Sequence, residues 1–470
     1  TMPLPQMSSD HAEPRKDVRP AGGTRLRAIG RMAVRSSHQW VVLRDALGLR
    51  ERKAADAEHL RAAMAWLCRA QDISGCGGVS AGYYLASGWL PPYPETTGYI
   101  IETFLRYGAG TAHDTRGLAS PARDTPAATG GGRYIDRAVR MGDWECEIQL
   151  PDGGVRGQIG VNDYPIVFNT GQVMLGWLAL HRHTGEQRYL DAAARAGDWL
   201  AKIQEPDGRW VRHSHNGIPH AYHARVAWPL LELAAVTHDA RHADAGERFT
   251  AWVLRQVRSN GCIGHMGFVA EPWAYTHTIA YTMRGLLESS AFLEGDLQRE
   301  ARRVVTTMAE KLLMLFELAK DDPRGRPRDL PGAFDEDWRP VGTKATCCCS
   351  SDTSGHAHQQ VDSVRHHGPR HHGPRYTCLT GDAQLAIVWL KLYRLTGDAR
   401  LVNAALKLID QVKSTQRLGS RHPGIRGAVA GSYPLWGGYE RFGYPNWAAK
   451  FLADAIMLQE QVMGELEGFA

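Results

Sequence analysis

Apolar residues recur every three or four positions along most of this chain, which is the spacing of one face of an α-helix. Residues 173–180 are an example, with Val173, Leu175, Trp177, Leu178 and Leu180 at helical spacing. Such stretches alternate with short segments rich in glycine and polar residues from about residue 57 onward. The pattern therefore predicts an all-α chain whose helices are joined by irregular loops.

One recurring half-unit is a helix that ends in glutamine and is followed by a glycine turn. Glycine after a helix end is the usual left-handed stop, and Asp-Gly or Asn-Gly is a turn signal. The copies run from Trp66 to Gln71 with Gly75, from Trp144 to Gln149 with Asp152-Gly153-Gly154, and from Trp199 to Gln204 with Asp207-Gly208. Weaker copies run from Trp252 to Gln256 with Asn260-Gly261 and from Leu408 to Gln416 with Gly419.

The alternating half-unit begins with polar or aromatic residues and then becomes apolar. Its first copy is Glu95-Thr96-Thr97-Gly98-Tyr99, where Pro94 and the threonines form a helix-start signature. The other copies are Phe168-Asn169-Thr170-Gly171-Gln172, Ala221-Tyr222-His223-Ala224-Arg225, Tyr275-Thr276-His277-Thr278, Tyr376-Thr377-Cys378 and Tyr444-Pro445-Asn446-Trp447.

The two half-units form six helix pairs, if residues 301–318 supply the outer partner of the fifth pair without a Gln–Gly ending. Six pairs closed in a ring give an (α/α)6 toroid, whose inner helices start at one rim around a shared cavity. An open superhelix of pairs is the alternative. We expect a single toroid over residues 57–470 and a loop insertion at 319–375. Residues 1–56 should form a basic tail, with a possible helix within residues 24–50.

Composition narrows the functional classes. Hydrophobic residues make up 43% of the 470 positions and charged residues 22%, as in ordinary soluble globular proteins. The net charge of +5, much of it carried by the first 53 residues, suits an anionic ligand but is too weak to indicate nucleic acid. No apolar run approaches the ~18–20 residues of a membrane span, and no signal-peptide pattern is visible.

Cysteine usage bears on the compartment and on metal binding. Eight cysteines in a chain of this length, three of them consecutive at 347–349, do not make a disulfide scaffold. We therefore expect a reducing, cytoplasmic setting. The duplicated pentapeptide His-His-Gly-Pro-Arg at 366–375 is low-complexity sequence and predicts a surface loop. Contiguous cysteines are poor tetrahedral ligands, so we expect neither a metal nor another cofactor.

The toroid would bring the starts of its inner helices, and the loops beside them, together at one rim. Aromatic faces pack on pyranose C–H surfaces, and polar groups read hydroxyls and carboxylates, so such a set fits a saccharide. Core packing explains any one of these residues, taken alone, equally well. The candidate catalytic residues are Glu95, Asn169, His223, Arg225, His277 and Tyr281. The candidate substrate-binding residues are Tyr99, Asp163, Tyr164, Tyr222, Glu271, Trp273, Tyr275, Trp436, Tyr439, Glu440, Tyr444, Asn446 and Trp447.

The repeats over residues 57–466 resemble those of helical-toroid enzymes of carbohydrate metabolism. These include unsaturated glucuronyl hydrolases, N-acylglucosamine 2-epimerases and the toroidal domains of polysaccharide lyases. The Trp…Gln…Asp-Gly turns also look like those of squalene-cyclase and prenyltransferase toroids. The resemblance implies an (α/α)6 enzyme, and it leaves the reaction open.

Two mechanisms compete for this predicted site. Asn169, His223 or His277, Tyr281 and Arg225 resemble the Asn/His/Tyr/Arg group of toroidal lyases. In that group an amide or arginine neutralises a uronate carboxylate, His or Tyr removes the C5 proton, and a tyrosine protonates the leaving oxygen. A C5-epimerase shares the first step.

The second mechanism is glycoside hydrolysis by a pair of carboxylates, which requires a proton donor facing a base across the scissile bond. The pair would be chosen from Glu95, Asp163, Glu271, Asp382 and Glu440. A scaffold that binds a saccharide or a partner protein without catalysis, and a terpene cyclase, are further alternatives. The chain lacks a Gly-rich phosphate loop and a His-Glu-x-x-His motif.

Overall fold

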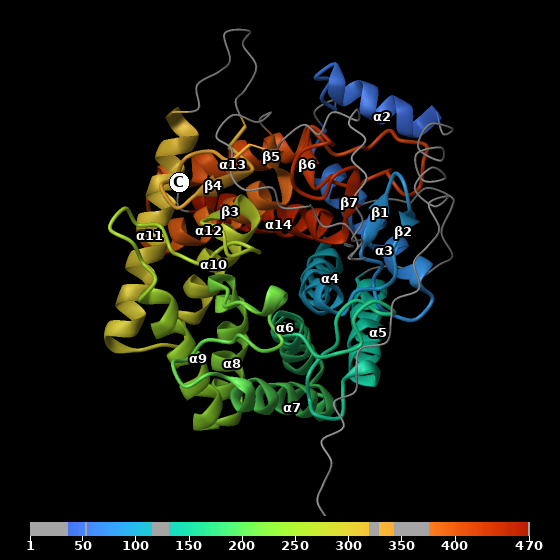
Figure 1. Ribbon diagram of the computed structural model, residues 1–470. Coiled ribbons are helices and arrows are strands. Elements are labelled where there is room, and N and C mark those ends of the chain that lie inside the picture. Colours follow the sequence, from blue (N-terminus) through green and yellow to red (C-terminus); the bar gives the residue numbers. More distant parts are fainter. Residues whose placement is uncertain (1–35, 52–53, 115–130, 319–328, 343–375, 469–470) are drawn as a thin grey trace, which may run out of the picture.

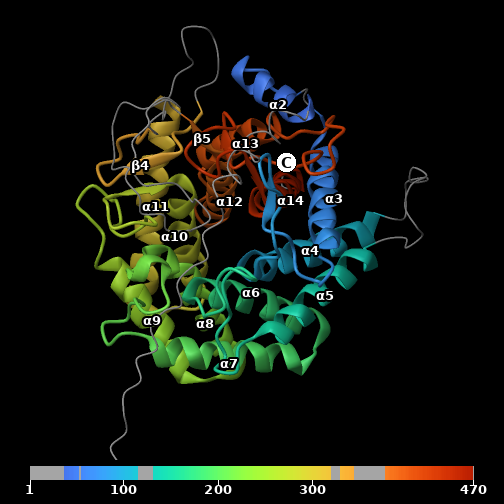
Figure 2. The same ribbon diagram turned by 45° about the vertical axis from the view of Figure 1, so that its right-hand side comes forward.

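The computed structural model describes residues 36–51, 54–114, 131–318, 329–342 and 376–468. The helices of this part form two concentric rings (Figures 1 and 2). The inner ring consists of α4 (Pro94–Asp114), α6 (Val167–Thr184), α8 (Ala224–Thr237), α10 (Thr276–Ser289), α12 (Leu379–Thr396) and α14 (Asn446–Gly468). The outer ring consists of α3 (Asp56–Ser74), α5 (Gly132–Ile148), α7 (Gln187–Ile203), α9 (Ala240–Leu254), α11 (Gly295–Leu318) and α13 (Ala399–Lys413).

The rings are closed. Each inner helix packs on the next along the chain, and α14 packs both on α4 and on α3. Figure 1 shows this closure as the red α14 lying beside the blue α3 and α4. The predicted (α/α)6 toroid is therefore confirmed, and the open superhelix is wrong. The one clear error of boundary is α11, which begins at Gly295 rather than near residue 301.

Burial differs between the two rings in the way their sequences dictate. All the residues of α6 from Val167 to Leu180 are buried, because an inner helix is covered by its two neighbours and its outer partner. In α7 the buried positions form a stripe of tyrosine, alanine, tryptophan and leucine, and the rest of the helix faces solvent. The near-continuous apolar inner helices thus form the wall around the centre of the ring.

The Gln–Gly turns tie neighbouring outer helices together. The Gln149 side-chain amide donates to Gly153 O and to Ala192 O of α7, both at 2.9 Å. Gly153 has φ +95°, and a Cβ there would lie 2.2 Å from Arg195 O, so this turn requires glycine twice over. The same amide arrangement recurs at Gln71, Gln204 and Gln416.

The glycines that approach the next outer helix are not all the expected ones. In the first turn the close approach is made by Gly77, and in the last by Gly427. Gly75 instead ends α3 in the left-handed conformation, and a Cβ on Gly419 would meet no atom within 4 Å. The helix-end glycine and the packing glycine are thus separate residues where the turn is longer.

Short strands hold the loops at the rim where the inner helices begin. Strand β1 (Gly82–Tyr84) pairs with β2 (Gly88–Trp89) and β7 (Gly443–Pro445), with Tyr83 opposite Tyr444. Strand β3 (Trp273–Tyr275) pairs with β4 (Ala333–Asp335), and β5 (Thr377–Cys378) pairs with β6 (Ser432–Tyr433). Since β3, β5 and β7 run directly into α10, α12 and α14, this pairing fixes where those helices start.

Two segments outside the repeats attach to the same rim. Helix α2 (Ser36–Ala46) lies within the range where the sequence suggested a helix, and Asp45 forms a buried ion pair with Arg417. Arg50 binds Asp329 at 2.7 Å. The rest of the basic tail, the cysteine trio and the His-His-Gly-Pro-Arg duplication lie outside the described residues. None of the described helices has the length and apolar content needed to cross a bilayer.

Candidate functional site

The first turn of α4 carries Glu95, whose carboxyl has a pKa close to neutral pH. Tyr93, just before the helix, donates a 2.5 Å hydrogen bond to Glu95 Oε2. Burial raises the pKa of Glu95 to about 7, although the Tyr93 bond and the positive charge of Arg225 both act to lower it. The side chain remains partly exposed. Glu95 is therefore both reachable and able to gain or lose a proton near neutral pH.

Arg225 at the start of α8 is a fixed cation whose charge acts on this carboxylate. Its Nε donates to Gln172 Oε1 at 2.8 Å, and Gln172 Nε2 donates back to Arg225 O at 3.0 Å. The guanidinium carbon lies 4.8 Å from the ring centroid of Tyr281 and 5.8 Å from that of Tyr99. The reciprocal amide bonds and the surrounding rings hold the guanidinium in one orientation.

His277 in the first turn of α10 is a neutral imidazole. Burial, followed by the charge of Arg225, lowers its pKa to about 3. Gln384 Nε2 lies 2.8 Å from His277 Nδ1. Because an amide NH2 group can only donate, Nδ1 accepts and the ring proton is on Nε2. The ring centroid of Tyr281, one turn further along the helix, lies 4.2 Å away.

A second carboxylate faces the same region from the loop before β7. Tyr84 donates a hydrogen bond to Glu440, and burial raises the pKa of this carboxyl above its ordinary value. The charge of Glu440 in turn raises the pKa of Glu95. Beside it, Trp447 Nε1 donates to the Tyr439 hydroxyl at 2.8 Å. The ring of Tyr439 lies 5.0 Å from His277.

These contacts define a central cluster at the starts of the inner helices. Its carboxylates, Trp447, Tyr84 and Tyr93 are partly exposed, whereas the other members, His277, Arg225, Tyr99, Tyr281 and Tyr439, are buried. The cluster thus combines a carboxyl with a pKa of about 7, the positive charge of Arg225 and a neutral imidazole. The members that the sequence predicted are Glu95, Tyr99, Arg225, His277, Tyr281, Tyr439, Glu440 and Trp447.

Three further candidates are buried around the central cluster. Asn169 donates to Arg156 O at 3.1 Å. Its amide also acts on the pKa of Tyr93, which places it near the Tyr93–Glu95 pair. His223 is fully buried among aromatic rings, the ring centroid of Tyr222 at 5.1 Å among them, and neither ring nitrogen has a hydrogen-bond partner in the described chain. Asn169 and Tyr222 thus adjoin the Tyr93–Glu95 pair, and His223 packs against Tyr222.

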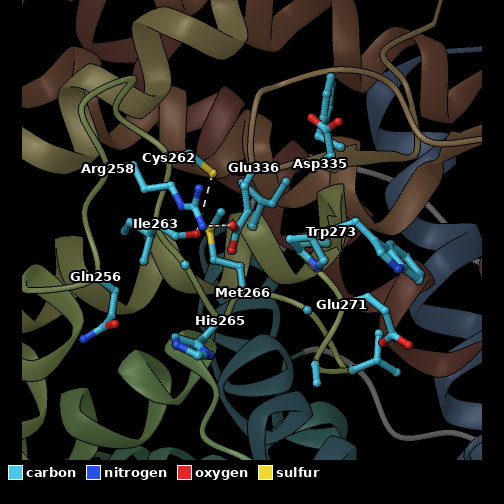
Figure 3. Close-up of a pocket in the computed structure, with 18 of the residues that line it drawn as sticks. Gln256, Arg258, Cys262, Ile263, His265, Met266, Glu271, Trp273, Asp335 and Glu336 are labelled. Atoms are coloured by element: carbon cyan, nitrogen blue, oxygen red, sulfur yellow. Dashed lines mark hydrogen bonds and ion pairs between the residues drawn. The ribbon is translucent and has the colours of Figure 1, made fainter. Parts of the chain in front are cut away.

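The remaining candidates have other surroundings. Asp163 and Tyr164 are exposed on the turn before α6. Asn446 Nδ2 donates to Ser80 O and Thr96 Oγ1, which fixes the rim loops. The Tyr275 hydroxyl donates to Gly438 O, and Tyr444 pairs with Tyr83 in the rim sheet. Trp436 is half-buried in the loop before β7. Glu271 and Trp273 line a separate cavity (Figure 3).

Sequence reasoning missed several residues of the central cluster. Lys450 is 3% exposed, with Nζ 2.5 Å from Asp454 Oδ2 and 5.1 Å from the Tyr99 ring centroid, and burial lowers its pKa to about 8. Its position one turn after Asn446 is a signal that helical spacing offered. Tyr93 was similarly marked by lying two residues before Glu95. Tyr84 and Gln384 had no such signal, since their contacts depend on tertiary packing.

One group among the described residues has the spacing of metal ligands, namely Asp198, Asp239 and His242 on the outer ring. Arg241 Nη2 lies 3.0 Å from Asp198 and 2.6 Å from Asp239. An arginine therefore already occupies the place between the carboxylates, and this group adds nothing to the central cluster.

Comparison with known proteins gives a fold. No family model matches the chain. The solved structures similar to it include an unsaturated glucuronyl hydrolase specific for heparin, with a TM-score of 0.58 and 12% identity, covering 86% of this chain and 97% of the other. A cellobiose 2-epimerase from Bacillus thermoamylovorans B4167 has a TM-score of 0.57 and 11% identity, and the match covers 84% of this chain and 97% of the other. The chain has the (α/α)6-toroid fold of these enzymes.

Two curated proteins share part of the sequence. An ent-copalyl diphosphate synthase from Streptomyces sp. (strain KO-3988) is 32% identical over 142 residues, which are 28% of this chain and 27% of that protein. A probable squalene–hopene cyclase from Sinorhizobium fredii (strain NBRC 101917 / NGR234) is 27% identical over 114 residues, which are 23% of this chain and 18% of that protein. The chain thus matches about a quarter or less of the length of these relatives.

Proposed function

We propose that this toroid is a carbohydrate-active enzyme that abstracts the C5 proton of a uronate unit in an anionic saccharide. The observation that carries the proposal is the Glu95 carboxyl, which has a pKa of about 7 and feels the positive charge of Arg225. A general base is most effective when its pKa is close to the working pH. The neighbouring toroid structures, a glucuronyl hydrolase and an epimerase, support a saccharide as the substrate.

In this mechanism the Glu95 carboxylate takes the C5 proton. The electron pair moves onto the uronate carboxyl group, where the Arg225 guanidinium neutralises the developing charge. His277, with a pKa of about 3, is too weak a base to compete, but its Nε2–H can donate a hydrogen bond. For elimination, the C4–O bond breaks and the leaving oxygen takes the proton of Tyr281. For epimerisation, the Tyr281 proton returns to C5 on the opposite face.

A second candidate is glycoside hydrolysis by Glu95 and Glu440. The specific observation in its favour is that burial raises the pKa of both carboxyls and that each is hydrogen-bonded by a tyrosine. A protonated carboxyl facing an ionised one across a glycosidic bond is the arrangement that inverting and retaining hydrolases share. Arg225 and His277 would then bind substrate without taking part in proton transfer.

The deciding experiment incubates the protein with a panel of uronate polysaccharides and follows three signals together. Absorbance of unsaturated uronate indicates elimination, C5 deuterium exchange without cleavage indicates epimerisation, and new reducing ends alone indicate hydrolysis. Binding with none of the three would leave a non-catalytic saccharide-binding scaffold. The partial matches to diterpene and triterpene cyclases make a prenyl diphosphate and squalene necessary additions to the panel. Turnover of either one would overturn the carbohydrate proposal.

A further inference from the structure

A cavity of about 430 Å³ opens at one corner of the toroid, away from the central cluster. It lies between the connection from α9 to α10, residues 255–274, and strand β4. Figure 3 shows Arg258, Met266 and Glu336 gathered in its middle, with Trp273 to one side. Its volume falls within the range of small-molecule sites.

The cavity occurs where the repeat is broken. At four corners the amide of Gln71, Gln149, Gln204 or Gln416 bonds both its own turn and a neighbouring outer helix. At this corner Gln256 Nε2 donates instead to Trp252 O of its own helix, at 3.0 Å. The amide that closes the other corners is therefore turned away here, and the space beside it is left open.

The lining combines an aromatic face with a polar pair. The partly exposed Trp273, together with Met266, Ile263 and Phe334, supplies apolar surface. Arg258 forms an ion pair with Glu336, whose side chain is only 16% exposed. An indole face beside a carboxylate–guanidinium pair matches the C–H face and the hydroxyls of a sugar ring.

The charges of the lining argue against an anionic ligand. Two arginines, Arg255 and Arg258, are outnumbered by Glu271, Asp335 and Glu336. Arg255 Nη2 is also engaged with Asp207 O, at 3.0 Å. In the central cluster, by contrast, Arg225 carries no ion pair to a carboxylate among the described residues. A neutral sugar ring therefore fits the corner cavity better than a uronate does.

The wall of the cavity is fastened to residues that adjoin the central cluster. Ala221 N donates to His265 O at 2.8 Å, and His220 Nδ1 lies 2.9 Å from Gly267 O, so the wall is fastened to the 3-10 turn η2 (Ala221–His223). On the inner side the ring of Phe268 lies 5.7 Å from Tyr222 and 6.5 Å from His277. Phe268, in the connection that forms this wall, is thus in ring contact with His277 of the central cluster.

We propose that the corner cavity is an accessory subsite for a neutral sugar unit, which Trp273 stacks against and the Arg258–Glu336 pair hydrogen-bonds. The inference rests on the proposed action on saccharides. It adds that the substrate contains neutral units besides the uronate, or that a neutral glycan binds separately from the reacting unit. Nothing in the subsite takes part in proton transfer.

Titration calorimetry with neutral oligosaccharides of two to six units tests this directly, using cello-, malto- and xylo-oligosaccharides as probes. We expect binding by the wild-type protein and equally by Glu95→Gln, since the cavity is separate from Glu95. Trp273→Ala should weaken binding at least tenfold, and Trp273→Phe should restore part of it. Trp40→Ala removes a tryptophan that is 54% exposed on α2 and should have no effect. Glu336→Gln gives a second test that leaves the Trp273–β4 pairing intact.

The outcomes separate this inference from the proposed function. If no neutral saccharide binds, or if binding survives both Trp273→Ala and Glu336→Gln, the subsite is refuted whatever the uronate panel shows. If neutral saccharides bind and Trp273→Ala abolishes that binding, the subsite is supported. Absence of turnover in the uronate panel would then count against the reaction and leave the subsite standing.

Discussion

The Tyr93 hydroxyl donates to Glu95 Oε2 at 2.5 Å, across the single residue Pro94. Pro94 is the first residue of α4, and its fixed φ directs the chain into the helix while Tyr93 remains outside it. The local geometry of the helix start thus brings the donor to the carboxylate. Burial raises the pKa of Glu95 to about 7, and the Tyr93 bond opposes that rise.

The pH dependence of activity should respond to Tyr93→Phe. The Tyr93 bond stabilises the Glu95 carboxylate, so its loss raises the pKa of Glu95 above about 7. A hydrogen bond to a charged group is worth about 1.5–3 kcal/mol, which corresponds to about one to two pKa units. The limb of the pH–rate profile that reports Glu95 deprotonation should move to higher pH by that amount. In Tyr189→Phe, which loses a 2.7 Å bond to Asp143 on the outer ring, the profile should not move.

Glu95→Gln should lower kcat by about 10²–10⁴-fold, the usual contribution of a general acid or base. The substitution keeps the size of the side chain and can still accept from Tyr93, so KM should change much less. Steady-state kinetics on whichever substrate the panel identifies will show this split. Glu147→Gln, on the exposed face of α5, is the matched control and should retain full activity. Full activity in Glu95→Gln would remove Glu95 from the mechanism.

Stability should depend on the packing glycines of the turns. In Gly153→Ala the new Cβ meets Arg195 O at 2.2 Å and also sits at a positive φ. Gly185→Ala, at the end of α6, has φ +73° but no atom within 4 Å of the Cβ. We expect a loss of about 1 kcal/mol in Gly185→Ala from backbone strain alone. Gly153→Ala should lose a further ~1–3 kcal/mol from overpacking.

Denaturant unfolding of the two variants measures this difference directly. Both substitutions replace glycine by alanine at a positive φ, so the gap between them isolates the contact with α7. Equal losses in the two variants would show that the turn relaxes without cost and that glycine is required there for φ alone.

Much of this fold could be predicted from the sequence because the toroid is built from repeats. The Gln ending of the outer helices, as at Gln149 and Gln204, is a local signal with a repeated structural role. The regularity also made the irregular places hard to see. Gln256 lies four residues after Trp252, whereas Gln204 lies five after Trp199. The packed structure shows that the Gln256 amide turns back to Trp252 O.

The central cluster was predictable where its residues lie in the first turn of an inner helix, as Glu95, Arg225 and His277 do. Tyr281 lies one turn after His277, and Lys450 lies one turn after Asn446, so helical spacing places them on the same face as those residues. Tyr84 was out of reach, because its bond to Glu440 joins loops 356 residues apart through the pairing of β1 with β7. Tyr164, which the sequence also assigns to the rim, is exposed on its loop, and its role in substrate binding stays a prediction.

The pH dependence of stability should carry the signature of Glu145. This residue of α5 is fully buried, and neither carboxyl oxygen has a hydrogen-bond partner within the described chain. Burial, with a smaller effect of Cys76, raises its pKa well above 4.5. Above pH 4.5 the unfolded chain therefore releases this proton while the folded protein retains it. The free energy of unfolding should fall by about 1.4 kcal/mol per pH unit from this group until the folded pKa is reached.

Glu145→Gln removes that slope, because an amide does not titrate. We expect the difference in unfolding free energy between variant and wild type to grow in favour of the variant as the pH rises from 5 to 8. The difference should level off once the pH passes the pKa of Glu145 in the folded protein. Glu147→Gln changes the same residue type two positions away on the exposed face, and its difference from wild type should stay flat. Denaturant titrations at each pH provide the comparison, and parallel curves for Glu145→Gln and wild type would mean that Glu145 is ionised in the folded protein.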